Sequence, residues 1–149
     1  MSKQPTSDKT TVLNFLKEQP MATISTVAKG SNQPESALIA FTQTQDLEIV
    51  FESFIDTRKW RNLKTNPYVA FVIGWDTNKH ITVQYEGIAT PIPGSEAEKY
   101  IQLFLVKDTP CTEKFLRDPR VQLYKATPVW VRYSDYTMNV PKVIEIDFR

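Results

Sequence analysis

The chain of 149 residues has very little of the chemistry on which several large protein classes depend, with one cysteine, one histidine and four glycines. Cys111 can form no internal disulfide, and with His80 alone beside it the chain has no cluster of thiolate and imidazole ligands for zinc. The glycines are scattered and form neither a G-x-G-x-x-G motif nor a P-loop. We therefore expect no zinc enzyme, no Cys–His protease and no Rossmann domain.

Long apolar runs and excess charge are also missing. The longest apolar stretch, residues 69–75, is far shorter than the ~18–20 residues that span a bilayer. Residues 1–8 are polar and are not followed by the apolar segment of a signal peptide. Eighteen Lys and Arg against 17 Asp and Glu give a net charge of +1, hence no overall field for a nucleic acid or an anionic membrane. These features predict a cytoplasmic protein that binds neither nucleic acid nor an anionic membrane. Any site that binds an anion is then expected to be a local cluster of cations.

What the sequence does have is a two-residue alternation of apolar and polar positions, interrupted by ten prolines. The length favours one domain over residues 1–149. The stretch 68–75 is apolar on both faces, so we expect it to be the most buried strand. The alternation predicts strands at 21–28, 35–42, 47–53, 68–75, 81–90, 129–136 and 143–148.

Helices are expected only as insertions between strands. Ser7 is placed to cap a helix over 8–18, and Thr57 to cap a short helix over 58–65. Ser95 with Glu98 has the spacing of a capping box before about three helical turns. A shorter helix is expected over 113–117. Because strands and helices do not alternate regularly, the pattern favours a mainly β protein, a closed or partly closed antiparallel barrel of about six strands.

The start of the helix at 58 combines a hydroxyl with two cations. A helix N-terminus carries partial positive charge, so Arg58 and Lys59 in the first turn are poorly placed unless an anion binds there. A phosphate could accept hydrogen bonds from Thr57, the first backbone amides and both cations, with Ser53 nearby. The alternative is an ordinary helix cap whose solvated cations are offset by Asp56.

The segment 51–75, FESFIDTRKWRNLKTNPYVAFVIGW, resembles the pyridoxamine 5′-phosphate oxidase-like family of FMN-binding split barrels. The strand at 21–27 with its hairpin to 37–41, and the segment 82–87, follow in the same order, so that the resemblance covers residues 10–148. It implies a six-stranded antiparallel split barrel that forms a homodimer, with two FMN cofactors in grooves between the subunits.

The resemblance also implies roles for individual residues. Thr57, Arg58 and Lys59 match positions that hold the flavin phosphate, and Glu52 and Ser53 match positions near the ribityl chain and ring. Thr82 and Gln84 lie on the strand that reaches the cofactor from the partner subunit. Apart from the resemblance, the spacing of Trp130 and Arg132 places both on one strand face, where they either meet the edge of a ring or form a tryptophan at the rim with an arginine stacked on it. Trp60 and Trp75 are expected in the core.

The sequence departs from the family pattern at two places, and both narrow the range of functions that the resemblance implies. Ser36 stands where the vitamin oxidases carry an arginine that adds to phosphate binding, and the Arg-x-His-x-Arg element that binds their pyridoxal substrate is missing, since the only histidine is His80 in a turn. The chain is therefore not expected to oxidise vitamin B6. His80 is interpreted as a solvated turn residue and Cys111 as a structural or idle thiol.

The preferred hypothesis is an FMN-dependent oxidoreductase that passes hydride or electrons between a small donor, such as a reduced nicotinamide, and the flavin. The cofactor carries the redox chemistry, so the absence of a set of acid and base residues is compatible with this class. Two alternatives stay open. One keeps the fold and binds the deazaflavin F420 or haem, for which His80 is the single imidazole available. The other is a non-catalytic flavin-binding module, which Ser36 favours.

Overall fold

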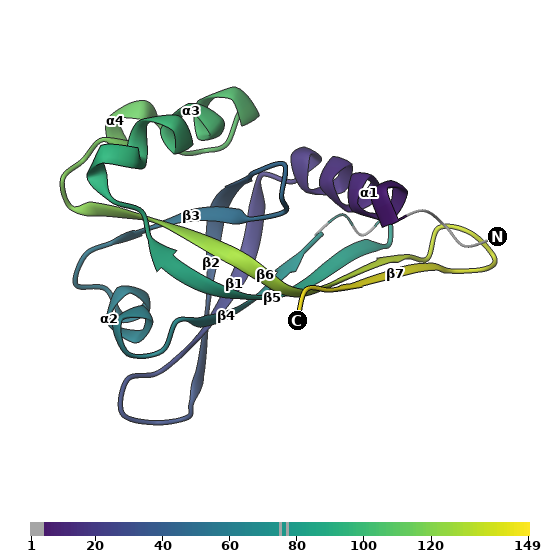
Figure 1. The fold of residues 1–149 in the computed structure, drawn as a ribbon, viewed down its shortest axis with the longest axis horizontal. Coiled ribbons are helices and arrows are strands. Elements are labelled where there is room, and N and C mark those ends of the chain that lie inside the picture. Colours follow the sequence, from purple (N-terminus) through teal and green to yellow (C-terminus); the bar gives the residue numbers. More distant parts are fainter. Residues whose placement is uncertain (1–4, 75, 77) are drawn as a thin grey trace.

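The computed structural model describes residues 5–74, 76 and 78–149 (Figure 1). The expectations for the first four residues and for Trp75 fall outside these residues. The sheet contains seven strands: β1 Met21–Val27, β2 Pro34–Gln43, β3 Ile49–Phe54, β4 Tyr68–Ile73, β5 Ile81–Pro91, β6 Val121–Asp135 and β7 Lys142–Asp147.

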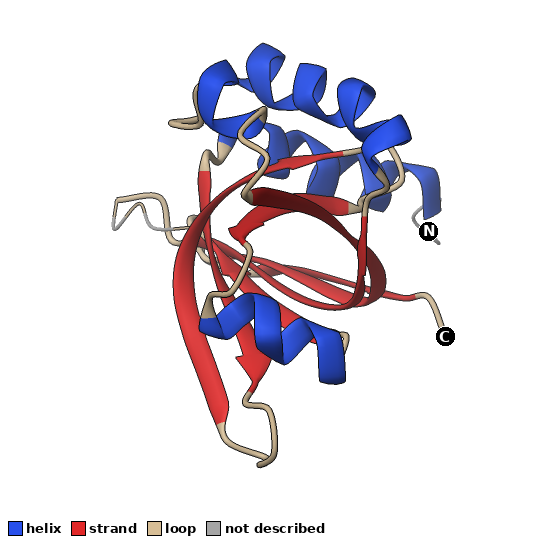
Figure 2. Ribbon diagram, turned by 90° about the vertical axis from the view of Figure 1, so that its left-hand side faces the viewer, coloured by secondary structure: helices blue, strands red, loops and turns tan. Residues whose placement is uncertain are grey.

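The strands form a closed antiparallel barrel. Their order is β3-β2-β1-β4-β5-β6, and β6 pairs again with β3, so that six strands complete a ring (Figure 2). β7 pairs only with the second half of β6 and lies outside the ring. The predicted mainly β barrel of six antiparallel strands is confirmed, as are the hairpins β1–β2 and β4–β5.

β6 begins at Val121, eight residues before the predicted strand, and it serves two partners. Residues 121–126 pair with β3, and residues 130–135 pair with β7. Pro128 lacks an N–H and normally interrupts a strand. Here it lies at a register shift in which Gly87 faces Pro128 while Glu86 faces Trp130. The irregularity lets one strand continue through a proline that the alternation pattern treats as a boundary.

The helices are α1 Pro5–Glu18, α2 Arg58–Thr65, α3 Ala97–Lys107 and α4 Glu113–Leu116. α2 lies on the opposite side of the barrel from the other three (Figures 1 and 2). α1 starts before Ser7, so that residue is not its cap. Ser95 lies in a 3-10 turn that makes no side-chain capping bond, so the predicted capping box is wrong. None of the helices in the described residues is long and apolar enough to cross a bilayer.

Two apolar clusters stabilise the fold, one inside the barrel and one outside it. Ile49 and Phe51 of β3 point into the barrel, where α1 adds Val12 and Leu16. Val50, between them in sequence, packs outward against α3 and α4. β3 is therefore buried on both faces over these residues.

Residues 68–73 of the stretch expected to be the most buried strand form β4, which alternates between exposed and buried positions. Val69, Phe71 and Ile73 are buried in the barrel, whereas Tyr68 and Val72 are 62% and 47% exposed. The prediction was wrong because α3 and α4 cover the outside of β3, while the outer face of β4 stays uncovered in the single chain.

Candidate functional site

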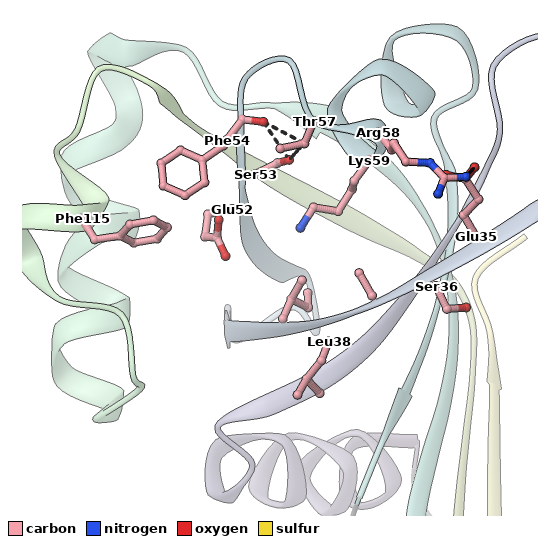
Figure 3. Close-up of a pocket in the computed structure, with 12 residues that line it drawn as sticks. Glu35, Ser36, Leu38, Glu52, Ser53, Phe54, Thr57, Arg58, Lys59 and Phe115 are labelled. Atoms are coloured by element: carbon pink, nitrogen blue, oxygen red, sulfur yellow. Dashed lines mark hydrogen bonds and ion pairs between the residues drawn. The ribbon is translucent and has the colours of Figure 1, made fainter.

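A cavity of about 450 Å³ lies between β2, the end of β3, the start of α2 and Phe115 of α4 (Figure 3). It is lined by five of the residues that the sequence suggested as a binding site: Glu52, Ser53, Thr57, Arg58 and Lys59. Ser36 also lines it, and its Oγ is 2.8 Å from that of Ser25. The cavity therefore has two hydroxyls, two cations and a carboxylate from one continuous stretch of chain, 52–59.

Thr57 caps α2, as predicted. Its Oγ1 accepts from the backbone N–H of Trp60 at 3.4 Å and donates to the carbonyl oxygen of Phe54 at 2.8 Å. The buried hydroxyl of Ser53 lies 2.9 Å from Thr57 Oγ1 (Figure 3). The end of β3 and the first turn of α2 are thus joined by a pair of hydroxyls in the cavity wall.

Arg58 forms an ion pair with Glu35 of β2, a residue that sequence reasoning missed. Asn62 Nδ2 donates to the other oxygen of Glu35 at 2.8 Å and to Thr26 Oγ1 at 3.0 Å. The hydrogen bond from Asn62 lowers the pKa of Glu35, and the neighbouring Arg58 lowers it further. Glu35 is therefore an ionised partner of Arg58, and only the register of the β1–β2 hairpin, with Glu35 opposite Thr26, could have indicated it.

Asp56 does not offset the two cations of the cavity. Its Oδ1 accepts from Arg61 Nη2 at 2.7 Å, on the exposed side of α2. The alternative interpretation relied on Asp56 to neutralise Arg58 and Lys59, and in the structure that carboxylate is engaged elsewhere.

Lys59 and Glu52 are half-buried, and neither makes a hydrogen bond or an ion pair within 4.0 Å to any described residue. Burial lowers the pKa of Lys59, while the charge of Glu52 raises it. Burial raises the pKa of Glu52, and the charge of Lys59 lowers it. Lys59 and Glu52 thus influence each other through space, and each has unused hydrogen-bonding capacity in the cavity (Figure 3).

The other predicted site residues lie elsewhere in the chain. Thr82 and Gln84 are on β5, and Trp130 and Arg132 are on β6. Gln84 is exposed and pairs in register with Arg132, whose guanidinium is 3.2 Å from Glu145 of β7. None of the four lines the cavity within one chain.

His80 and Trp60 occupy ordinary structural positions. His80 is exposed in the connection between β4 and β5, and its carbonyl oxygen accepts from the backbone N–H of Tyr136 at 3.1 Å. Trp60 packs against the barrel core, as predicted, with the ammonium of Lys64 3.8 Å from its ring centre.

Comparison with known proteins identifies the family of the chain. A family model described as pyridoxamine 5′-phosphate oxidase matches residues 9–135. The chain belongs to this family. A curated pyridoxine/pyridoxamine 5′-phosphate oxidase of Bacteroides fragilis is 25% identical over 85 residues, which are 57% of this chain and 36% of the relative. The chain thus spans little more than a third of the length of that enzyme.

Two solved structures share the fold of this family member at low identity. A candidate pyridoxamine 5′-phosphate oxidase of Listeria innocua superposes with a TM-score of 0.68 at 19% identity, over 84% of this chain and 96% of the other. A haem-binding protein of Mycobacterium smegmatis gives a TM-score of 0.79 at 12% identity, over 99% of this chain and 60% of the other. The same barrel therefore occurs in a protein described as a candidate oxidase and in one described as haem-binding.

Proposed function

We propose that this family member binds FMN in the cavity beside α2 and acts as a flavin-dependent oxidoreductase. The observation that carries the proposal is Lys59, a half-buried cation with no hydrogen-bonding or ion-pair partner among the described residues. The charge of Glu52 acts on Lys59 only through space, and a partly desolvated ammonium that makes no hydrogen bond is costly. A bound phosphate would supply the acceptors that this ammonium lacks. The first-turn amides of α2 would add the donors of a helix N-terminus.

The residues present fit the phosphate end of FMN. Lys59 offers a point charge, and Arg58 offers the guanidinium donors that Glu35 leaves free. The hydroxyls of Thr57 and Ser53 bond to each other and to the carbonyl of Phe54, so they would have to turn in order to donate to a phosphate. Glu52 has no donor partner among the described residues, so it could accept hydrogen bonds from hydroxyls of the ribityl chain. Bound FMN would supply the hydride-accepting ring, and the protein would hold and orient it.

Oxidation of vitamin B6 is not part of the proposal. A second phosphate beside the flavin would need its own cluster of donors. The strands β6 from Val129 onward and β7 offer Arg132, which is paired with Glu145, and Lys142 at the start of β7. The expected substrate of the flavin is a reduced nicotinamide or another small donor.

A homodimer is part of the same proposal. Apolar side chains remain exposed on the outside of the barrel, at Leu38, Tyr68, Val72 and Ile88. Val72 pairs in register with Gln84, and Gln84 with Arg132, so the outlying site residues continue this surface. A second copy packed there would bury the apolar side chains and could bring Gln84 and Arg132 to its partner's cofactor.

Haem is the second candidate, supported by the fold shared with the haem-binding protein of Mycobacterium smegmatis. Haem needs an axial ligand, and the imidazole of His80 lies outside the cavity of its own chain. FMN is therefore preferred.

The test is the absorption spectrum of the purified protein, followed by anaerobic titration. A flavin spectrum that bleaches with NADH or NADPH, but not with pyridoxine 5′-phosphate, would support the proposal. A sharp Soret band would favour haem, and a deazaflavin spectrum would favour F420. A protein that stays colourless after addition of FMN would indicate that the cofactor site has been lost, and rapid bleaching by the vitamin phosphate would contradict the assigned substrate class.

A further inference from the structure

A second cavity of about 450 Å³ adjoins the first along the wall formed by β2 and β3. The two share Leu38, Ile39, Glu52 and Phe115. The second cavity extends away from Arg58 and Lys59 toward Met21 of β1 and the segment 110–112 before α4. A ligand bound there would lie beside the phosphate-binding residues without touching them.

The lining of this second cavity is apolar except at three residues: Glu52, Cys111 and Thr112. Thr112 is engaged as the cap of α4, where its Oγ1 accepts from the backbone N–H of Phe115 at 3.2 Å. Burial raises the pKa of the Cys111 thiol to about 11, so the thiol is neutral at physiological pH. The remaining walls are aliphatic or aromatic, and none of the described residues that line the cavity is a cation.

Glu52 lies between the two cavities, with Phe115 on one side and Lys59 on the other (Figure 3). Its carboxylate accepts no hydrogen bond from any described residue although it is half-buried. A buried acceptor without a donor is costly, so a ligand N–H would be bound favourably there. An anion would meet a carboxylate and no compensating cation in the second cavity.

We propose that this cavity is a binding subsite for a neutral or positively charged aromatic molecule that carries an N–H donor, with Glu52 as its anchor. The aromatic ring would pack between Phe115 and the apolar side chains of β1 and β2, and the donor would reach the carboxylate. That this subsite holds the substrate of the flavin rests on the proposed function, whereas binding itself does not.

Two probes with the same ring and opposite charge test the proposal: tryptamine and indole-3-acetate. Binding is followed by NMR of the protein labelled with ¹³C at the methionine methyl groups. Met21 lies in the cavity wall, and Met138, 61% exposed in the connection between β6 and β7, is the internal control. Tryptamine should shift the Met21 signal in a saturable way and leave Met138 unchanged, and indole-3-acetate should bind about tenfold more weakly or worse.

Glu52→Gln should remove most of this preference, because it keeps the shape of the side chain and deletes its charge. Glu48→Gln is the matched control, since Glu48 precedes β3, pairs with Lys125 at 3.2 Å and does not line the cavity. Equal binding of both probes to the wild-type protein, or an unchanged preference in Glu52→Gln, would overturn the proposal.

Titration with FMN separates this inference from the proposed function. If FMN fails to bind while tryptamine still shifts Met21, the cofactor assignment fails and the subsite stands. If FMN itself shifts Met21 and prevents tryptamine from binding, the cavity belongs to the cofactor and the subsite proposal is wrong.

Discussion

Arg58 and Glu35 form an ion pair in the wall of the cavity, and Asn62 holds the other oxygen of the carboxylate. The charge of Arg58 is therefore partly compensated before any ligand arrives. Lys59, the next residue, has no such partner among the described residues. We therefore expect a bound phosphate to stabilise Lys59 more than Arg58, although the two cations are neighbours in one helical turn.

The first prediction concerns this difference. Replacing Arg58 and Lys59 together by Ala should weaken FMN binding by more than ~2 kcal/mol, since hydrogen bonds to charged groups contribute ~1.5–3 kcal/mol each. Lys59→Ala alone should cost more than Arg58→Ala. Titration of FMN fluorescence quenching measures both. Arg61→Ala is the control, because Arg61 lies on the same helix but pairs with Asp56, which precedes the helix. Unchanged affinity in the folded double variant would show that the phosphate binds elsewhere.

The second prediction concerns Glu35→Gln. The substitution keeps an oxygen that can accept from Asn62 but removes a negative charge beside the phosphate site. We expect FMN to bind about threefold more tightly, as is typical of a single charge interaction near a protein surface. The gain should shrink as salt concentration rises. Weaker binding would instead show that Glu35 serves to orient Arg58.

The third prediction concerns assembly. Sedimentation should give twice the 17.2 kDa mass of one chain. Val72→Glu should dissociate the dimer, since it places a charge on the exposed apolar surface of β4. Val106→Glu is the control, because Val106 is 85% exposed on α3, away from that surface. A wild-type monomer at micromolar concentration with FMN bound would contradict the proposed dimer.

The fourth prediction follows from Lys107, whose ammonium donates to the carbonyl of Leu16 and to Gln43 at 2.9 and 2.7 Å. Burial lowers the pKa of Lys107 to about 7 from its usual 10.5. Between these values the folded state binds fewer protons than the unfolded state, so stability should rise with pH across that range. Below pH 7 this gain is absent.

Urea unfolding at several pH values measures the effect of Lys107. The free energy of unfolding of the wild type should increase relative to Lys107→Met between pH 7 and pH 10.5. Parallel pH profiles for the two proteins would mean that Lys107 keeps its usual pKa in the folded chain.

The parts of the site that the sequence predicted are those carried by contiguous residues. Ser53 to Lys59 combine a strand end, a helix cap and two cations within seven positions, so local rules suffice to suggest a cavity wall there. Glu35 could not be predicted in this way, because it lies 23 residues before Arg58 and reaches it only through the register of a hairpin. The second cavity depends on three separate strands and on α4, which no local pattern brings together.

The predictions about the fold that were wrong failed for a similar reason. The composition of 68–75 shows that many side chains are apolar, but not which of them other elements cover. α3 and α4 cover Val50 of β3 and leave Val72 of β4 exposed. At Ser95 the capping residues are present, yet the chain enters the helix through a 3-10 turn instead. Tertiary packing decides both outcomes.

The long strand β6 joins the closed ring to one appended strand, β7. Its first half completes the ring with β3, and its second half carries β7 outside the ring. Residues 142–147 are not needed to close the ring, yet they are tied to its interior through Ile144, which is 4% exposed and belongs to the barrel core. A substitution at Ile144 would therefore disturb the interior of the barrel through a strand that takes no part in closing it.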